Sequence, residues 1–140
     1  MKPTGLFASV GLLVLRIVSG AMMIAAHGWG KYESFADKAD SFADPLGLGP
    51  KWSLICTIIT EVACSALLVI GLGTRLAAAA LVFTFGVVIF VVHGEDSVLD
   101  RELPILYLGI YATIVATGPG IFSFDALIAR RRRKQKEKGE

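Results

Sequence analysis

The sequence predicts an all-α membrane protein, a bundle of four transmembrane helices. Of its 140 residues, 54% are hydrophobic and 19% are charged, and the mean hydropathy is +0.65. A soluble domain of this size exposes too much of its chain for such a composition. The apolar residues also occur in long blocks rather than in the three-four stripe of a soluble amphipathic helix. We therefore expect one membrane domain.

Four apolar blocks account for the predicted spans. A hydrocarbon core about 30 Å thick is crossed by about 20 apolar residues. The first two blocks meet this length, the third is near the lower limit, and the fourth is short. The fourth is completed by the glycine-rich segment that follows it, or by local thinning of the bilayer. The blocks are residues 6–26, 52–72, 76–92 and 103–117.

The distribution of basic residues predicts that both termini are cytoplasmic. Arg130, Arg131, Arg132, Arg133 and Lys134 follow the last span directly, and cytoplasmic flanks of spans carry the excess of Lys and Arg. We divide the chain into a transmembrane domain, residues 1–129, and a basic cytoplasmic tail, residues 130–140. We expect this tail to contact anionic lipids, at about 1 kcal/mol per basic residue, rather than nucleic acid.

The first outward loop, residues 27–51, contains a predicted interfacial helix. Phe35, Ala39 and Phe42 fall on one helical face, and most of the charged residues between positions 32 and 42 fall elsewhere. This pattern is typical of a short amphipathic helix that lies at a membrane surface.

Two opposite charges lie in the middle of the first two blocks. A lone Arg or acid at the bilayer centre costs about 2.5–3.5 kcal/mol on an insertion scale, and such residues usually face the bundle interior and pair. Counting from the inner ends of the blocks places Arg16 and Glu61 at depths of about 15 and 16 Å. We expect them to meet. The pair is either a structural ion pair that sets the register of the helices, or part of a pocket for a ligand such as a quinone headgroup.

A second polar cluster is expected at the outer face. His27 and Lys31 follow the first block, His93 ends the third, and Glu102 precedes the fourth. Histidine titrates near neutral pH and an adjacent carboxylate favours its protonation, so these residues are candidates for proton transfer. Snorkelling and capping at the ends of the spans are the alternatives. The chain has no compact zinc motif such as H-E-x-x-H, and we predict no metal site.

The order of several short motifs resembles that of the DoxX family. The motifs are Arg16 with His27-Gly28-Trp29-Gly30-Lys31, Glu61 with the segment 71–78, His93, Glu102-Leu103-Pro104, and the segment 118–127. The resemblance implies a small four-helix protein of the bacterial inner membrane. The family takes its name from a subunit associated with thiosulfate:quinone oxidoreductase, and other members are linked to membrane-bound redox complexes and to oxidative-stress or thiol defence.

The resemblance leads to three functional hypotheses. The first is a membrane component of a redox system, in which Arg16 and Glu61, or the outer cluster, bind a quinone and the His or Glu102 residues relay protons. The second is a non-catalytic subunit that docks a peripheral redox enzyme, and the third is a small proton-coupled transporter.

Cys56 and Cys64 lie about 12 Å apart along one helix, beyond disulfide reach. The sequence shows no flavin, haem or iron–sulfur motif, so we expect electrons to pass through a quinone or a partner.

Overall fold

The computed structural model describes residues 5–139, and these residues form helices and turns only. The predicted all-α class is therefore confirmed for this part of the chain. Three continuous helices in it are long and apolar enough to cross a membrane: Leu6–Glu33, Pro50–Ile70 and Thr74–Val92. A fourth apolar helix, α7 (Glu102–Thr117), has 16 residues. Its role as a span stays a prediction.

Each of the three long helices contains a π-helical stretch. The first consists of α1 (Leu6–Met23), η1 (Ile24–Gly28) and α2 (Trp29–Glu33). The second consists of α4 (Pro50–Ile58), η2 (Ile59–Cys64) and α5 (Ser65–Ile70). The third consists of α6 (Thr74–Val87) and η3 (Val88–Val92). The remaining helices are α3 (Phe35–Lys38) in the first loop and α8 (Phe124–Gly139) after α7.

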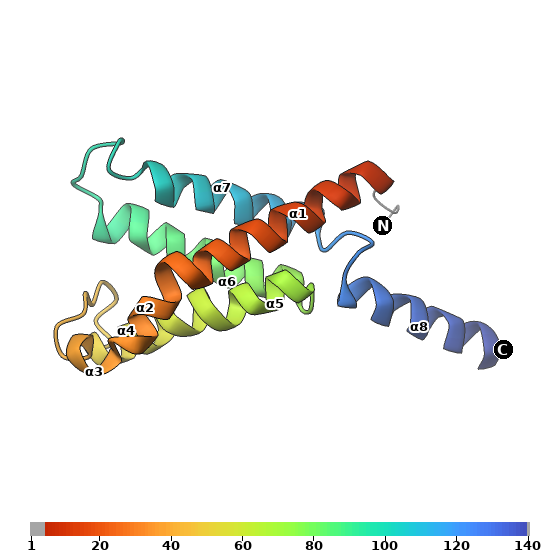
Figure 1. Cartoon of the computed structure of the whole chain (residues 1–140), viewed down its shortest axis with the longest axis horizontal. Helices are drawn as coiled ribbons and strands as arrows, with labels where there is room; N and C mark the ends of the chain where they lie inside the picture. Colours follow the sequence, from red (N-terminus) through yellow and green to blue (C-terminus); the bar gives the residue numbers. More distant parts are fainter. Residues whose placement is uncertain (1–4, 140) are drawn as a thin grey trace.

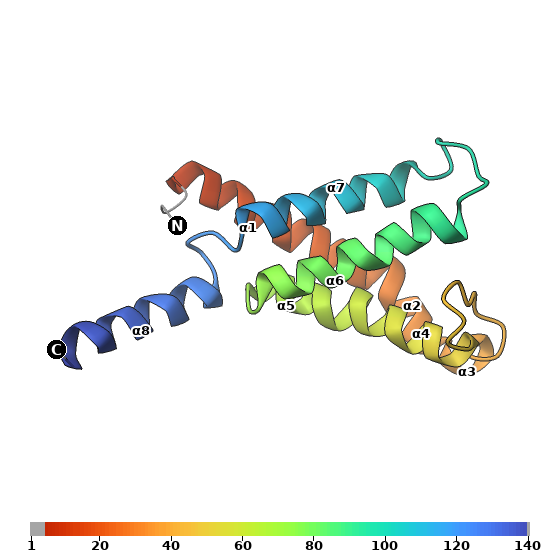
Figure 2. The same cartoon turned by 180° about the vertical axis from the view of Figure 1, so that it is seen from behind.

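The helices form an antiparallel bundle made of two hairpins. Helix α1 packs on α5, and α6 packs on α7, as Figure 1 and the reverse view in Figure 2 show. The start of α1 and helix α8 lie at the same end of the bundle, and the loop with α3 and the loop before α7 lie at the other end. The core is formed by Met23, Leu68, Ala77, Ala78, Leu81, Phe85, Tyr107, Tyr111 and Ile114.

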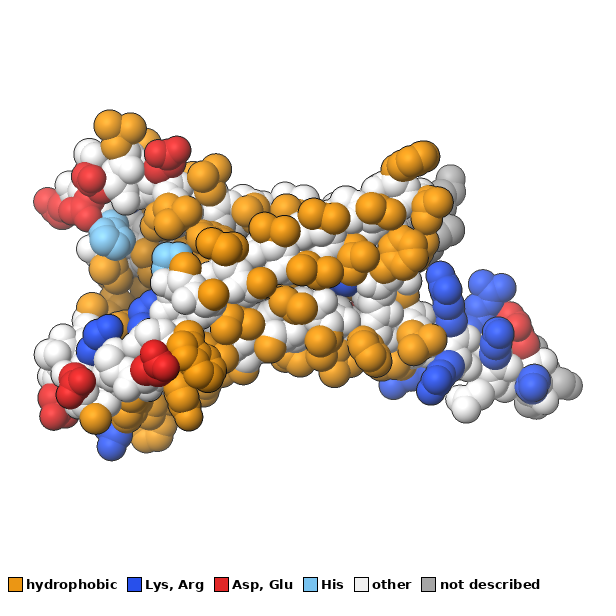
Figure 3. Space-filling model, in the orientation of Figure 1, with side chains coloured by type: hydrophobic (Ala, Val, Ile, Leu, Met, Phe, Trp, Pro, Cys, Tyr) orange, Lys and Arg blue, Asp and Glu red, His pale blue; other side chains and the backbone are white. Residues whose placement is uncertain are grey.

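The surface of the bundle matches a bilayer environment. Large hydrophobic side chains cover its middle in Figure 3. Along the middle of α1, for example, Val14 is 54% and Val18 is 56% exposed. Acidic side chains gather at the loop end, and basic side chains gather on α8 at the opposite end. An apolar middle between two charged ends is the surface expected of a helical membrane protein.

Two boundaries differ from the sequence prediction. The first helix continues to Glu33 instead of ending near Ala26, which places His27 and Lys31 one turn apart on a single helix. The predicted amphipathic helix is only the four-residue helix α3, because the chain turns after Lys38. The predicted division into a transmembrane domain and a basic tail stays a prediction; residues 129 and 130 both lie in α8. Residues 1–4 and 140 of the two predicted regions lie outside the described part of the chain.

Candidate functional site

The expected contact between Arg16 and Glu61 is wrong. Arg16 is fully buried, and its guanidinium donates to the carbonyl oxygens of Pro119 at 2.5 Å and Phe122 at 2.7 Å. Glu61 instead accepts two hydrogen bonds from the Lys31 ammonium, at 2.9 Å to Oε1 and 2.7 Å to Oε2.

The register of the first two spans explains this error. A Cβ atom at Gly71 would lie 2.6 Å from Arg16 Nη1, and one at Gly28 would lie 3.2 Å from Glu61. Arg16 is thus level with the end of α5, whereas Glu61 is level with Gly28, which is about 18 Å further along the first helix. The predicted depths assumed that the first two apolar blocks have their inner ends at the same depth. In the structure, α1 begins well beyond the end of α5.

Arg16 belongs to a network that joins the helix ends near α8. Asp125, at the start of α8, accepts hydrogen bonds from the amides of Gly73 at 2.8 Å and Thr74 at 2.9 Å, so it caps α6. The Asp125 amide donates to the Gly71 carbonyl at 2.9 Å. Burial opposes ionisation of Asp125, but hydrogen bonds from Thr74 and Gly73 together with the positive charge of Arg16 outweigh it and lower the pKa of this carboxyl. Arg16 and Asp125 therefore hold α8 against the spans, far from Glu61.

A cavity of about 470 Å³ lies at the opposite end of the bundle. It contains four of the six predicted site residues: His27, Lys31, Glu61 and His93. Arg16 and Glu102 do not line it, although Leu103 and Pro104 do. Much of the remaining wall is apolar or aromatic.

The three π-helical stretches border this cavity. His27 lies in η1, Thr60 and Glu61 lie in η2, and Val88 and Val92 lie in η3; all five line the cavity. A π turn inserts a residue into an α-helix, and such turns are frequent at functional sites. Apolar periodicity carries no signal for them, so the sequence did not predict these turns.

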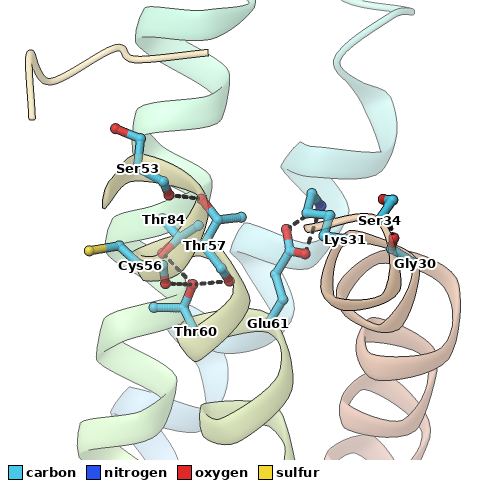
Figure 4. Close-up of polar contacts among 9 residues, drawn as sticks. All are labelled: Gly30, Lys31, Ser34, Ser53, Cys56, Thr57, Thr60, Glu61 and Thr84. Carbon is cyan, nitrogen blue, oxygen red and sulfur yellow. Dashed lines mark hydrogen bonds and ion pairs between the residues drawn. The ribbon is translucent and has the colours of Figure 1, made fainter. Parts of the chain in front are cut away.

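The Lys31–Glu61 ion pair is the charged centre of the cavity (Figure 4). The Glu61 side chain is 8% exposed and that of Lys31 is 23% exposed. An ammonium group has three donor hydrogens, and the two hydrogen bonds to Glu61 leave one of them. Lys31 is thus a cation with one donor left for a ligand.

His27 lies one turn before Lys31 and contacts an aromatic group. Its ring meets Tyr107 edge-on, at a centroid distance of 5.8 Å. Tyr107 stacks on Phe85 at 5.4 Å and on Tyr111 at 5.8 Å. Within the described residues, His27 has no hydrogen-bond partner, so both ring nitrogens are available as donor or acceptor.

The other predicted outer residues differ in position. His93 Nδ1 lies 2.6 Å from Asp96 Oδ2, so the imidazole is oriented by a carboxylate at the rim of the cavity. Glu102 is exposed at the start of α7 and does not line the cavity, although Leu103 and Pro104 beside it do. Its functional grouping with the two histidines stays a prediction. In the described chain, no three His, Cys, Asp or Glu side chains converge as a metal site would require.

The cavity wall contains a strip of hydroxyl groups that was not predicted from the sequence. Ser53, Thr57 and Thr60 follow helical spacing along α4 and η2, and Thr84 faces them from α6 (Figure 4). The Thr84 hydroxyl donates to Thr60 Oγ1 at 3.2 Å and ties the two helices together. Their spacing of three and four residues inside an apolar block is the signal that could have identified the strip.

Asp44 holds the loop that covers the cavity. Its carboxylate accepts hydrogen bonds from the Ser53 hydroxyl at 2.7 Å and from the amides of Leu48 and Gly49 at 2.9 and 2.8 Å. The Ser53 bond is the largest cause of the lowered pKa of Asp44. The loop residues Phe42, Pro45, Leu46 and Leu48 line the cavity.

Residues 11–94 match the family model described as DoxX. The matched segment is more than half of the chain, and it contains Arg16 and the cavity residues His27, Lys31, Glu61 and His93. The chain matches no curated protein and no solved structure.

Proposed function

The chain belongs to the DoxX family and is a multi-pass membrane protein, and we propose that it is a membrane component of a redox system that binds a quinone in the outer cavity. The observation that carries this proposal is the Lys31–Glu61 pair, which places a charged donor beside His27 in an apolar cavity. Intramembrane ionisable residues are functional more often than structural.

The cavity fits a quinone headgroup. Its volume of about 470 Å³ lies within the range of about 300–1,000 Å³ that is typical of small-molecule sites. Phe85 and Tyr107 offer aromatic surface, and Lys31 offers a donor for a quinone oxygen. In this proposal Lys31, and not Arg16, is the donor to the quinone. Arg16 does not line the cavity, and it bonds two backbone carbonyls elsewhere.

The chain's own residues have separate roles in this proposal. Lys31 donates to an oxygen of the ligand, and Glu61 holds the ammonium in place and balances its charge. His27 exchanges a proton with the same ligand, and His93 with Asp96 passes protons between the cavity rim and the outer loop. A quinone supplies two-electron, two-proton chemistry when bound.

We place the protein in the bacterial inner membrane with four spans and both termini in the cytoplasm. The redox system served is one of thiosulfate or of thiol and oxidative-stress chemistry, with a peripheral enzyme as electron partner. The exposed basic side chains of α8 from Arg130 to Lys134 contact anionic lipids of the inner leaflet.

A docking subunit without chemistry of its own is the second candidate. The observation that favours it is the outer loop before α7, where Val98 is 69% and Leu99 is 80% exposed. Apolar side chains on a loop tip are suited to a protein contact. Purification in a mild detergent tests this candidate, because the docking function requires a stoichiometric partner that is lost when both side chains are changed to Ser.

Binding of a decyl-tailed quinone to the protein in lipid nanodiscs tests the main proposal. The variant Lys31→Met with Glu61→Gln removes both charges together, because a single change leaves an unpaired buried charge that costs about 3–5 kcal/mol. A hydrogen bond to a charged group contributes about 1.5–3 kcal/mol. We therefore expect the Kd of the double variant to rise about tenfold to a hundredfold.

Lys38→Met is the matched control, because Lys38 is exposed and does not line the cavity. It should bind the quinone as the unchanged protein does. If the folded protein binds no quinone, or if the double variant binds with unchanged Kd, the proposal is wrong.

A further inference from the structure

The cavity reaches the side of the bundle as well as its outer end. Cys56 on α4 and Phe83 on α6 both line it, and both are exposed, Phe83 to 64%. Figure 4 shows the Cys56 sulfur pointing away from Glu61 and Lys31. Both residues lie within apolar spans, so this side of the bundle faces lipid. Cys56, Thr60, Phe83 and Val87 together form what we call the lateral mouth.

The threonine hydroxyls near the lateral mouth already have hydrogen-bond partners within α4, η2 and α6. The Thr57 hydroxyl donates to the Ser53 carbonyl at 2.8 Å, and that of Thr60 donates to the Thr57 carbonyl at 3.0 Å. The Thr84 hydroxyl lies 3.0 Å from the Ala80 carbonyl. Donors that are already bonded within the protein need no partner on a ligand. A hydrocarbon chain therefore leaves no hydrogen bond unmade there.

The polarity of the cavity is graded from the mouth inward. The charged pair Lys31–Glu61 lies on the side of α2 and η2, away from Cys56 (Figure 4). The outer end is covered by the loop that Asp44 holds through Ser53, Leu48 and Gly49. The cavity thus has a charged pair on the side away from the lateral mouth and an apolar opening toward lipid. This arrangement matches a molecule with a polar head and a long apolar tail.

We propose that the quinone enters sideways from the bilayer through the lateral mouth, and that its tail stays there beside Cys56, Phe83 and Val87. This inference rests on the proposed quinone site. It adds the route of entry and the requirement for a tail, neither of which follows from binding of the headgroup alone.

Alkylation of Cys56 tests the position of the tail. In the Cys64→Ala protein in lipid nanodiscs, Cys56 is the one cysteine of the chain, and its reaction with a membrane-permeant maleimide is followed over time. Two quinones with the same fully substituted ring are compared at saturation, one with an ethyl tail and one with a decyl tail. Binding of each is measured in the same sample. We expect the decyl quinone to slow the alkylation severalfold and the ethyl quinone to leave its rate unchanged.

Two variants provide the matched control. Phe83 and Phe90 are both lipid-exposed, at 64% and 74%, but Phe90 does not line the cavity. Phe83→Ala should remove most of the protection of Cys56 by the decyl quinone, and Phe90→Ala should retain it. If both quinones bind and neither slows alkylation, or both slow it equally, the lateral mouth is refuted while the quinone site stands. If neither quinone binds, the proposed function itself is refuted.

Discussion

At the scale of single residues, two buried charges are stabilised in different ways. Arg16 is surrounded by backbone, with the carbonyls of Pro119 and Phe122 as acceptors. Glu61 is paired with a side chain, the Lys31 ammonium. Nη1 and Nη2 of Arg16 bond backbone carbonyls, and its buried Nε has no partner among the described residues and does not reach the cavity. The Lys31 pair, by contrast, leaves one donor hydrogen in the cavity. The chemistry of the protein is therefore expected at Lys31 and not at Arg16.

Two glycines of one turn allow a direct test of the Arg16 site. Gly71 and Gly73 both have positive φ, +75° and +57°. A Cβ at Gly71 would lie 2.6 Å from Arg16 Nη1 and 2.7 Å from Ser123 Cβ, whereas a Cβ at Gly73 meets nothing. We expect Gly73→Ala to cost only the left-handed strain, roughly 1–2 kcal/mol.

Gly71→Ala should be more destabilising than Gly73→Ala by about 1–3 kcal/mol, because a displaced Arg16 leaves its buried guanidinium without the Pro119 and Phe122 carbonyls. Thermal unfolding in detergent measures both variants against the unchanged protein. Equal melting temperatures for the two variants would contradict the Arg16 network.

The sequence identified the residue types of the site better than their partners. His27, Lys31, Glu61 and His93 were all singled out, since ionisable groups in or beside apolar blocks stand out by composition. Their grouping was missed because it depends on how far α1 slides along α5. Gly20 and Gly28 set that position: a Cβ there would lie 2.9 Å from the Ser65 carbonyl oxygen and 2.6 Å from Val62.

At the scale of the elements, the first helix is longer than its apolar block. Hydropathy falls at His27, but the helix continues through η1 and α2 to Glu33. Gly28 permits this helix to pack closely on Glu61 and Val62. The continuation carries Lys31 into the cavity, where the ion pair with Glu61 compensates the burial of its charge.

The cap on α6 predicts a specific loss of stability in acid. The pKa of Asp125 is lowered in the folded protein. Its carboxylate therefore contributes fully to the free energy of unfolding above the ordinary pKa of 3.8, and this contribution is lost as the pH falls through the lower folded pKa. We expect Asp125→Ala to cost about 1 kcal/mol near neutral pH. The difference in melting temperature from the unchanged protein should shrink below pH 3.8. Asp40→Ala is the control at an exposed carboxylate, and a difference independent of pH would contradict the cap.

The side chains of α8 predict that its binding to the membrane surface depends on the charge of the lipid. Its first turns expose Phe124, Leu127 and Ile128, at 54%, 45% and 37%, and the basic run from Arg130 follows. Such a helix lies on an anionic surface with its apolar side in the headgroup region. A spin label at Gln135→Cys should be immobilised in nanodiscs that contain anionic lipid. It should be released by high salt or when Arg130–Arg133 are changed to Gln. The same mobility in neutral lipid would contradict this contact.

At the scale of the whole molecule, charge and cavity are arranged along one axis. The acidic loops and the cavity lie at one end of the bundle, and the basic helix α8 lies at the other (Figure 3). We propose that the basic end lies in the cytoplasm, which puts the proposed proton exchange at His27 and His93 in the outer half of the membrane.

This orientation is testable with single cysteines. In a chain with Cys56→Ala and Cys64→Ala, a membrane-impermeant maleimide applied to intact cells should label Ser97→Cys. It should label Gln135→Cys only after permeabilisation. Labelling of both positions in intact cells would mean that α7 does not cross the membrane, and the reverse pattern would invert the orientation.

The sequence by itself determined the properties that are local along the chain. Apolar blocks predict helices because a spanning backbone satisfies its hydrogen bonds internally, and the basic run predicts the cytoplasmic end. Only the tertiary structure decided which charges meet. The offset of α1 against α5 moves Arg16 to the Pro119 and Phe122 carbonyls and brings Lys31 to Glu61. Hydropathy is unchanged when one helix slides along another, so it contains no information on this offset.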